Sequence, residues 1–240
     1  MKFRKLGRTG LEVSCVGFGA LPLPGLGEEE AAVVLNTALD CGMNFIDTAR
    51  SYRESEELVG KAVHQRRGEF YLATKARTRR KDQILEELET SLGFLKTDRI
   101  DLYQIHFVNS GVDLEDVLSG EGALKVFKQV RDKGVIDHIG ITGHDPELLL
   151  KAAKTGEFDT VQGALSYIEK PVAALDLIDY CSRNDIGFIV QKPLAGGAII
   201  NAKSALKWIL QQPVSTVIPG MVLKNQVIEQ LKTSGVSSPF

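Results

Sequence analysis

The stretch Asn44-Phe45-Ile46-Asp47-Thr48-Ala49-Arg50-Ser51-Tyr52 joins a short apolar run to a polar segment. The apolar run is typical of a buried strand, and the small polar residues after it are typical of a loop that leads into a helix. Asp47 then ends the strand, and Tyr52 follows in the loop. We therefore expect both side chains to reach one pocket.

The same pattern recurs twice further along the chain. The apolar run 70–75 ends in Lys75, and the apolar run 100–106 ends in His106. From Asp47 to Lys75 and from Lys75 to His106 the distance is about 30 residues, the length of one strand-helix unit. If successive strands are parallel neighbours, Asp47, Lys75 and His106 lie side by side on one rim of the sheet.

This repeat extends over all 240 residues and predicts eight strand-helix units. We expect the strands at 15–19, 44–46, 69–75, 100–106, 136–142, 160–165, 187–192 and 214–218. We expect the helices at 28–41, 54–65, 81–95, 115–133, from Asp145 onward, 172–184, 204–211 and 225–233. A hairpin over 3–13 precedes them. The pattern therefore predicts an α/β fold, a (β/α)₈ TIM barrel with an N-terminal β-hairpin.

No linker or low-complexity segment divides the chain, so we expect residues 1–240 to form a single domain. A doubly wound sheet is the alternative fold, and it would usually carry Gly-x-Gly-x-x-Gly in its first turn. Here Gly17-Phe18-Gly19 is followed by Leu21-Pro22 and not by a helix start. The barrel is therefore favoured.

Composition argues against several classes of partner. The formal net charge of −2 gives no reason to expect nucleic acid, and no apolar run approaches the ~18 residues of a membrane span. The basic N-terminus lacks the apolar stretch of a secretory signal, and the three cysteines make no C-x-x-C pair. We expect a cytoplasmic protein. A metal site at His106, His138 and His144 is not expected, because His138 precedes the apolar part of its strand.

Asp47, Tyr52, Lys75 and His106 are each weak evidence of a catalytic site when taken alone. An aspartate after a strand, for example, most often caps a helix. Together they form a proton donor with its supporting groups. A tyrosine hydroxyl has a pKa near ~10, so it needs a nearby positive charge, which Lys75 supplies and Asp47 holds in place. His106 can hydrogen-bond a carbonyl oxygen. A carbonyl that receives a hydride on carbon needs a proton on oxygen, and Tyr52 can donate it.

These motifs resemble those of the aldo-keto reductases. The resemblance covers nearly the whole chain, through segments 6–14, 17–20, 44–52, 139–142, 161–162, 192–197 and 218–221 together with Lys75 and His106. It implies a (β/α)₈ barrel that reduces aldehydes or ketones with NADP(H), or alternatively NAD(H). Asp47, Tyr52, Lys75 and His106 fall on the family's catalytic positions, with Tyr52 as general acid.

The resemblance also implies the binding residues. The cofactor set is Gly19, Ala20, Asp47, Thr142, Gly143, Gln162, Lys192, Pro193, Leu194, Gly196, Gly220, Met221, Gln226, Glu229 and Gln230. The substrate, a small carbonyl compound, is expected against Leu21, Leu23, Phe107 and Val108, with His144 nearby.

The chain departs from the family pattern at three places. Thr142-Gly143 stands where Ser-Asn is common, Gln191-Lys192 stands where an aromatic residue is common, and the adenosine end is neutral. The last departure leaves NADH as an alternative coenzyme. The short segment after the eighth strand predicts an open pocket, or one completed by another subunit. A nucleotide-binding regulatory or scaffold module with little activity is the alternative function.

Overall fold

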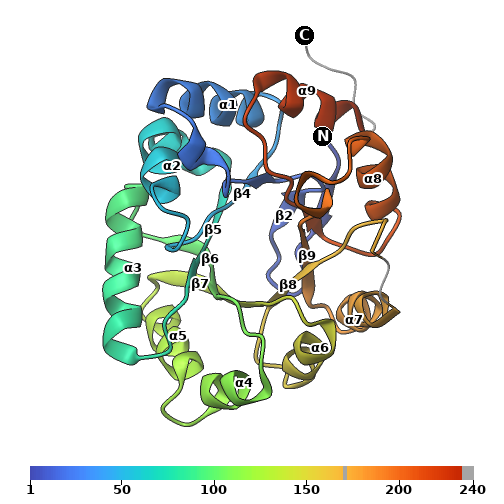
Figure 1. Ribbon diagram of the computed structural model, residues 1–240. Coiled ribbons are helices and arrows are strands. Elements are labelled where there is room, and N and C mark those ends of the chain that lie inside the picture. Colours follow the sequence, from blue (N-terminus) through green and yellow to red (C-terminus); the bar gives the residue numbers. More distant parts are fainter. Residues whose placement is uncertain (170–171, 234–240) are drawn as a thin grey trace.

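A closed ring of parallel strands forms the centre of the molecule, and helices surround it (Figure 1). The computed structural model describes residues 1–169 and 172–233. In ring order the strands are β3 (Phe18–Gly19), β4 (Phe45–Asp47), β5 (Tyr71–Ala76), β6 (Ile100–Ile105), β7 (Ile136–Thr142), β8 (Thr160–Ala164), β9 (Gly187–Gln191) and β10 (Thr216–Val217).

The first and last strands join to close the barrel. Gly17 donates its backbone N–H to the Val217 carbonyl (2.9 Å), and Gly19 donates to the Pro219 carbonyl (3.0 Å). Parallel bridges at Val16–Val217 and Gly19–Gly220 accompany these bonds. Because each strand pairs with its neighbour in the chain and the ends meet, the (β/α)₈ barrel is confirmed and the doubly wound sheet is excluded.

The N-terminal hairpin is also confirmed. Its strands β1 (Phe3–Lys5) and β2 (Glu12–Ser14) are antiparallel, and Leu6 and Val13 are buried in the apolar cluster inside the barrel. Gly7 lies against the residues before β9 with a φ of +53°, and a Cβ there would stand 2.2 Å from the Gly187 nitrogen. Only glycine fits that approach, so the hairpin closes the amino-terminal end of the barrel.

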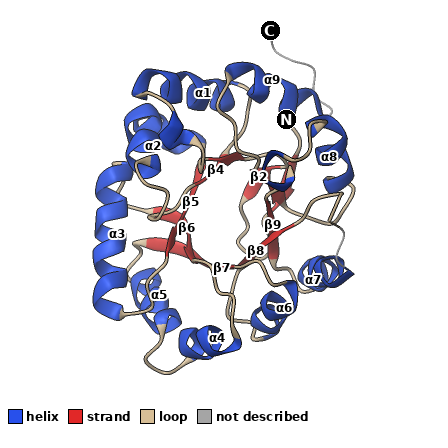
Figure 2. Ribbon diagram, in the orientation of Figure 1, coloured by secondary structure: helices blue, strands red, loops and turns tan. Residues whose placement is uncertain are grey.

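Helices cover the outside of the ring, as the colouring of Figure 2 makes plain. They are α1 (Glu28–Asp40), α2 (Ser55–Val63), α3 (Lys81–Leu95), α4 (Gly111–Leu118), α5 (Ala123–Asp132), α6 (Pro146–Lys154), α7 (Val172–Arg183), α8 (Ala202–Ile209) and α9 (Lys224–Thr233). Short 3₁₀ turns lie at Leu23–Gly25, His64–Glu69 and Ala195–Gly197.

The prediction of one helix over 115–133 is wrong, because α4 and α5 are separate. Ser110 begins α4 by accepting a hydrogen bond from the Asp113 N–H (3.1 Å). The chain then turns at Ser119, and Gly122 packs so closely that a Cβ would lie 2.0 Å from the Asp116 carbonyl oxygen. The Ser-Gly-x-Gly sequence permits this tight turn, and a continuous helix would not.

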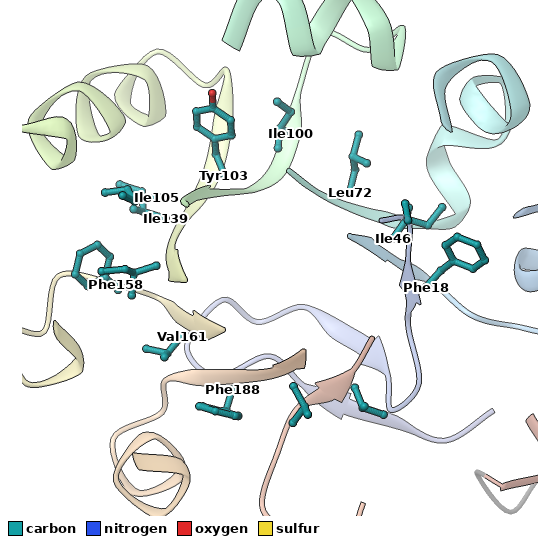
Figure 3. Packing of buried hydrophobic residues seen from close by; sticks show 14 of the residues in the cluster. Phe18, Ile46, Leu72, Ile100, Tyr103, Ile105, Ile139, Phe158, Val161 and Phe188 are labelled. Atoms are coloured by element: carbon teal, nitrogen blue, oxygen red, sulfur yellow. The ribbon is translucent and has the colours of Figure 1, made fainter. Parts of the chain in front are cut away.

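Alternation along the strands sorts side chains into two cores. The outward-facing residues pack beneath the helices, and Figure 3 shows labelled examples such as Leu72, Tyr103 and Phe188 pointing away from the ring. A smaller inner cluster contains Phe45, Ala73, Leu102 and Ile189.

Two residues further along each of these four strands, the inward position is polar: Asp47, Lys75, Gln104 and Gln191. The period of two along a strand therefore places a polar layer directly above the apolar one.

Candidate active site

A buried ion pair lies at the centre of the polar layer. The Lys75 ammonium donates to Asp47 Oδ1 (2.6 Å) and to the Thr48 carbonyl (2.6 Å), and Gln104 donates from Nε2 to Asp47 Oδ2 (3.1 Å). Lys75 is fully buried and Asp47 nearly so. Burial raises the pKa of Asp47, and Lys75 and Gln104 oppose that rise. Burial lowers the pKa of Lys75, but Asp47 and Tyr52 more than offset it, so the net shift is upward and Lys75 keeps its charge.

Tyr52 lies in the loop between β4 and α2, and its ring covers Lys75. The Lys75 ammonium is 5.0 Å from the ring centroid. The Tyr52 backbone bonds Ala49 (3.0 Å) and Ser55 (2.9 Å), and the Ser55 hydroxyl ties the loop to the Ala20 carbonyl (2.9 Å). These bonds hold Tyr52 above the ion pair.

A second buried network anchors the same loop from outside the barrel. Arg50 pairs with the fully buried Glu56, which also accepts a hydrogen bond from the Thr74 hydroxyl (2.6 Å). The Arg50 guanidinium stacks over the ring of Phe94. The position of Tyr52 thus depends on contacts on both sides of β5.

Burial raises the pKa of the Tyr52 hydroxyl above its ordinary value of 10.0, and Asp47 adds to the rise. The lowering that the sequence led us to expect from Lys75 acts on the hydroxyl, but burial outweighs it. Tyr52 therefore carries its proton at neutral pH. A protonated hydroxyl beside an ammonium is suited to donate a proton.

His106 faces Tyr52 across the cavity, with the two rings edge to face and their centroids 5.7 Å apart. Burial, together with the charges of Lys75, Arg77 and Arg79, lowers the pKa of His106 to about 3. The ring is therefore neutral. Its Nδ1 lies 3.2 Å from the Ser51 hydroxyl. When that hydroxyl donates, the proton of the neutral ring stays on Nε2, where it can be donated to an oxygen.

One cavity of about 600 Å³ brings most of the predicted site residues together. Its lining includes Tyr52 and His106 of the catalytic set and Leu21 and Phe107 of the substrate set. From the cofactor set it includes Gly19, Asp47, Thr142, Gln162, Lys192, Pro193, Leu194, Gly196, Gly220 and Gln226. Lys75 is buried beneath this surface, where it contacts the lining residues Tyr52 and Asp47.

Other predicted binding residues do not line the cavity. Leu23, Val108, Ala20 and Met221 are buried in the packing of the protein. Glu229 and Gln230 lie on α9, and Gln230 is buried.

Gly143 has no room for a side chain, because a Cβ would lie 2.4 Å from the Val108 carbonyl oxygen. That close approach accounts for glycine where the family pattern often has asparagine. The Gly143 carbonyl accepts a hydrogen bond from Gln191 Nε2 (2.8 Å). Gln191 thus occupies this part of the wall in place of the common aromatic residue.

Five lining residues were not predicted from the sequence: Pro22, Gln191, Gly197, Ile218 and Pro219. The inward-facing Gln104, which bonds Asp47, was not predicted either. Gln104 could have been found, since it stands two residues before His106 and must share its face of the strand. The others lie at strand ends and in loops, where no period sets the direction of a side chain.

Within 1–169 and 172–233, no three His, Cys, Asp or Glu side chains are grouped so as to hold a metal ion. In the same residues, no helix has both the length and the apolar character needed to cross a membrane.

Comparison with known proteins places the chain among relatives of one kind. The model of the aldo/keto reductase family matches residues 15–204. The uncharacterized oxidoreductase YqkF of Bacillus subtilis is 32% identical over 83% of this chain and 67% of its own length. The aldo-keto reductase YhdN of the same bacterium is 29% identical over 83% of this chain and 64% of its own. The chain therefore spans about two thirds of these relatives.

A solved structure matches more completely. The holo form of an aldo-keto reductase from Bacillus halodurans superposes with a TM-score of 0.86 at 25% identity, covering 100% of this chain and 93% of that one. The likeness extends over the barrel and its helices.

Proposed function

Because the chain belongs to the aldo/keto reductase family, we propose that it reduces aldehydes or ketones to alcohols with hydride from NADPH. NADH is the alternative coenzyme. The observation that carries the proposal is the placement of Tyr52 over the buried Lys75–Asp47 pair, at the wall of a cavity large enough for a small ligand. A protonated tyrosine there has a proton to give and a charged group to stabilise the phenolate that remains.

Each residue then has one role. Tyr52 donates its proton to the carbonyl oxygen, and Lys75 stabilises the phenolate by its charge. Asp47 holds Lys75 in place through the 2.6 Å contact. His106, neutral and with Nδ1 beside Ser51, donates a hydrogen bond from Nε2 to the same oxygen and so orients it.

The residues on the other side of the cavity fit a nicotinamide nucleotide, which supplies the hydride when bound. Gln162 is buried, lines the cavity, and its Oε1 has no hydrogen-bond partner among the described residues. That oxygen can accept from an amide N–H such as that of a carboxamide. Gly196 and Gly197 have positive φ and open space where a side chain would be, so their backbone can approach a pyrophosphate closely.

Two of the residues expected at the adenosine end hold the protein's own structure. The Gln226 side chain accepts hydrogen bonds from the N–H groups of Val222 (2.8 Å) and Leu223 (3.1 Å), so it holds its own turn. Met221 is buried in the core. Lys224 begins α9 and is the basic residue that we propose for a 2′-phosphate.

Incubation of the purified protein with 4-nitrobenzaldehyde and either NADPH or NADH tests the proposal. We expect loss of the reduced-nicotinamide absorbance with at least one coenzyme, and the faster reaction identifies the preferred one. Fluorescence titration of each coenzyme without aldehyde is the control. Tight binding with no oxidation across a panel of aldehydes would favour the regulatory module, and no binding of either coenzyme would overturn both functions.

Titration of His106 should cause no change in turnover near neutral pH. Since the pKa of His106 is lowered to about 3, the ring is neutral throughout the range from about pH 5 to about pH 8. The pKa of Tyr52 is raised, so its acid form persists below its pKa and activity falls only as pH rises through that value. A profile of kcat/KM against pH checks this. A fall centred near pH ~6.5 would mean that a charged histidine does the work.

A further inference from the structure

A second hollow shares the Phe107 side chain with the catalytic cavity. Its volume is about 380 Å³, and it is lined by Arg77, Arg79, Phe107, Asn109, Ser110 and Asp113. Phe107 also lines the catalytic cavity, and its ring centroid is 6.5 Å from that of His106. A ligand that crosses this ring would therefore touch both spaces.

Arg77 brings an uncompensated charge to the second hollow. Its guanidinium carbon lies 5.8 Å from the Phe107 centroid. Its backbone N–H donates to Glu87 (3.1 Å) and its carbonyl accepts from Arg79 (2.8 Å), but within 1–169 and 172–233 its guanidinium has no hydrogen bond or ion pair. An arginine fork without a carboxylate partner is a ready site for one.

The neighbouring Arg79 is already neutralised. Its guanidinium bonds Asp113 at 2.8 Å and 3.1 Å and also donates to the His106 carbonyl (2.9 Å). The hollow therefore holds two positive charges and one negative charge. A single further negative charge would balance them.

The wall between the two spaces is held in place. The Phe107 N–H donates to the Thr142 hydroxyl (2.9 Å), and the ring packs edge to face against His144 at 4.9 Å. Phe107 also has a φ of +61°, a conformation that bulky residues adopt only where their surroundings impose it. The spacing between the catalytic groups and Arg77 is thus set by one fixed ring.

We propose that the preferred substrate is an aldehyde or ketone that also carries a carboxylate, which binds Arg77 while the carbonyl lies at Tyr52 and His106. The inference rests on the proposed function, and it adds the substrate class. A spacer about as long as a phenyl ring joins the two groups and packs on Phe107. A carboxylate fits better than a phosphate, because its single charge balances the hollow, whereas a phosphate dianion would add repulsion from Asp113.

Two matched aldehydes test this class. In 4-carboxybenzaldehyde the ring carries the acid, and in methyl 4-formylbenzoate it carries the neutral ester. We expect the acid to have a kcat/KM about fivefold higher than the ester, the upper size of one exposed arginine-carboxylate pair. Arg77→Met should remove this preference by raising KM for the acid, and the kcat/KM for the ester should stay within about twofold of its value in the unaltered protein. Arg77→Lys should keep part of the preference for the acid, since lysine keeps the positive charge but lacks the paired N–H donors of the guanidinium.

Arg80→Met is the matched control, because Arg80 is on the same loop and is exposed like Arg77, but its guanidinium is paired with Asp82. We expect this variant to leave kcat/KM unchanged for both the acid and the ester. Equal kcat/KM for acid and ester in the unaltered protein, or equal losses for both in Arg77→Met, would overturn the inference and leave the reductase function standing. A faster reaction with 4-formylphenyl phosphate would overturn the choice of carboxylate.

Calorimetric binding of terephthalate, which has no reducible carbonyl, separates the two proposals. If neither aldehyde is reduced, terephthalate binding that Arg77→Met abolishes would support the carboxylate site and count against the reductase. If terephthalate does not bind and the acid is not preferred over the ester, both measurements would contradict the carboxylate site.

Discussion

Replacing Tyr52 with phenylalanine is expected to lower kcat for aldehyde reduction by about 10²- to 10⁴-fold, the usual contribution of a positioned general acid. The substitution removes one hydroxyl and keeps the ring against Lys75, whose ammonium is 5.0 Å from the centroid. The loop should also persist, because it is held by backbone bonds and by Ser55. Steady-state kinetics with 4-nitrobenzaldehyde and the preferred coenzyme measures the loss.

Coenzyme binding is the control for this variant, and its dissociation constant should stay within about twofold of the unaltered protein. A loss of both binding and turnover would point to a disturbed pocket and not to a missing proton. Undiminished turnover in Tyr52→Phe would rule out Tyr52 as the acid.

Asp47→Ala should have the largest effect on stability, a loss of about 3–5 kcal/mol in the free energy of unfolding. The fully buried Lys75 would lose its carboxylate partner and keep the Thr48 carbonyl, and Gln104 would lose the group to which it donates. An ammonium without a counter-ion in a buried layer is costly. Urea unfolding at neutral pH measures the change, and turnover should fall with it.

A double variant, Asp47→Ala with Lys75→Met, distinguishes the buried charge from the lost packing. Removing both charges should restore part of the stability that Asp47→Ala loses. Arg80→Ala, which breaks an exposed pair with Asp82, should leave unfolding unchanged. If Asp47→Ala unfolds like the unaltered protein, the ion pair has no role in holding this layer together.

Much of the fold could be predicted because three apolar runs end in polar residues one unit apart. Parallel pairing places Asp47 beside Ala73 and Lys75 beside Gln104, so residues far apart in the chain share one rim. The sequence pattern carries this information directly, since the order of the strands is encoded in the repeat. Strand length is less well encoded, because the strands expected at 15–19 and 214–218 are only Phe18–Gly19 and Thr216–Val217. The placement of His106 at the end of the third run follows the same logic.

The parts that could not be predicted depend on close approach or on loop direction. The break between α4 and α5 follows from how Gly122 meets the Asp116 carbonyl, a contact that no period reveals. Leu23 and Val108 are apolar residues beside the expected pocket, but they are buried in the core. In sequence, an apolar residue that lines a cavity looks the same as one that packs beneath it.

The most direct test of the account follows the hydride itself. Reduced coenzyme that carries deuterium at both positions of its hydride-donating carbon is incubated with the protein and 4-nitrobenzaldehyde, and the alcohol is analysed by mass spectrometry. The account predicts one deuterium on the carbinol carbon for each coenzyme oxidised, and a yield in Tyr52→Phe that is lower by the same factor as kcat. Alcohol without deuterium, or no alcohol from a protein that binds the coenzyme tightly, would contradict it.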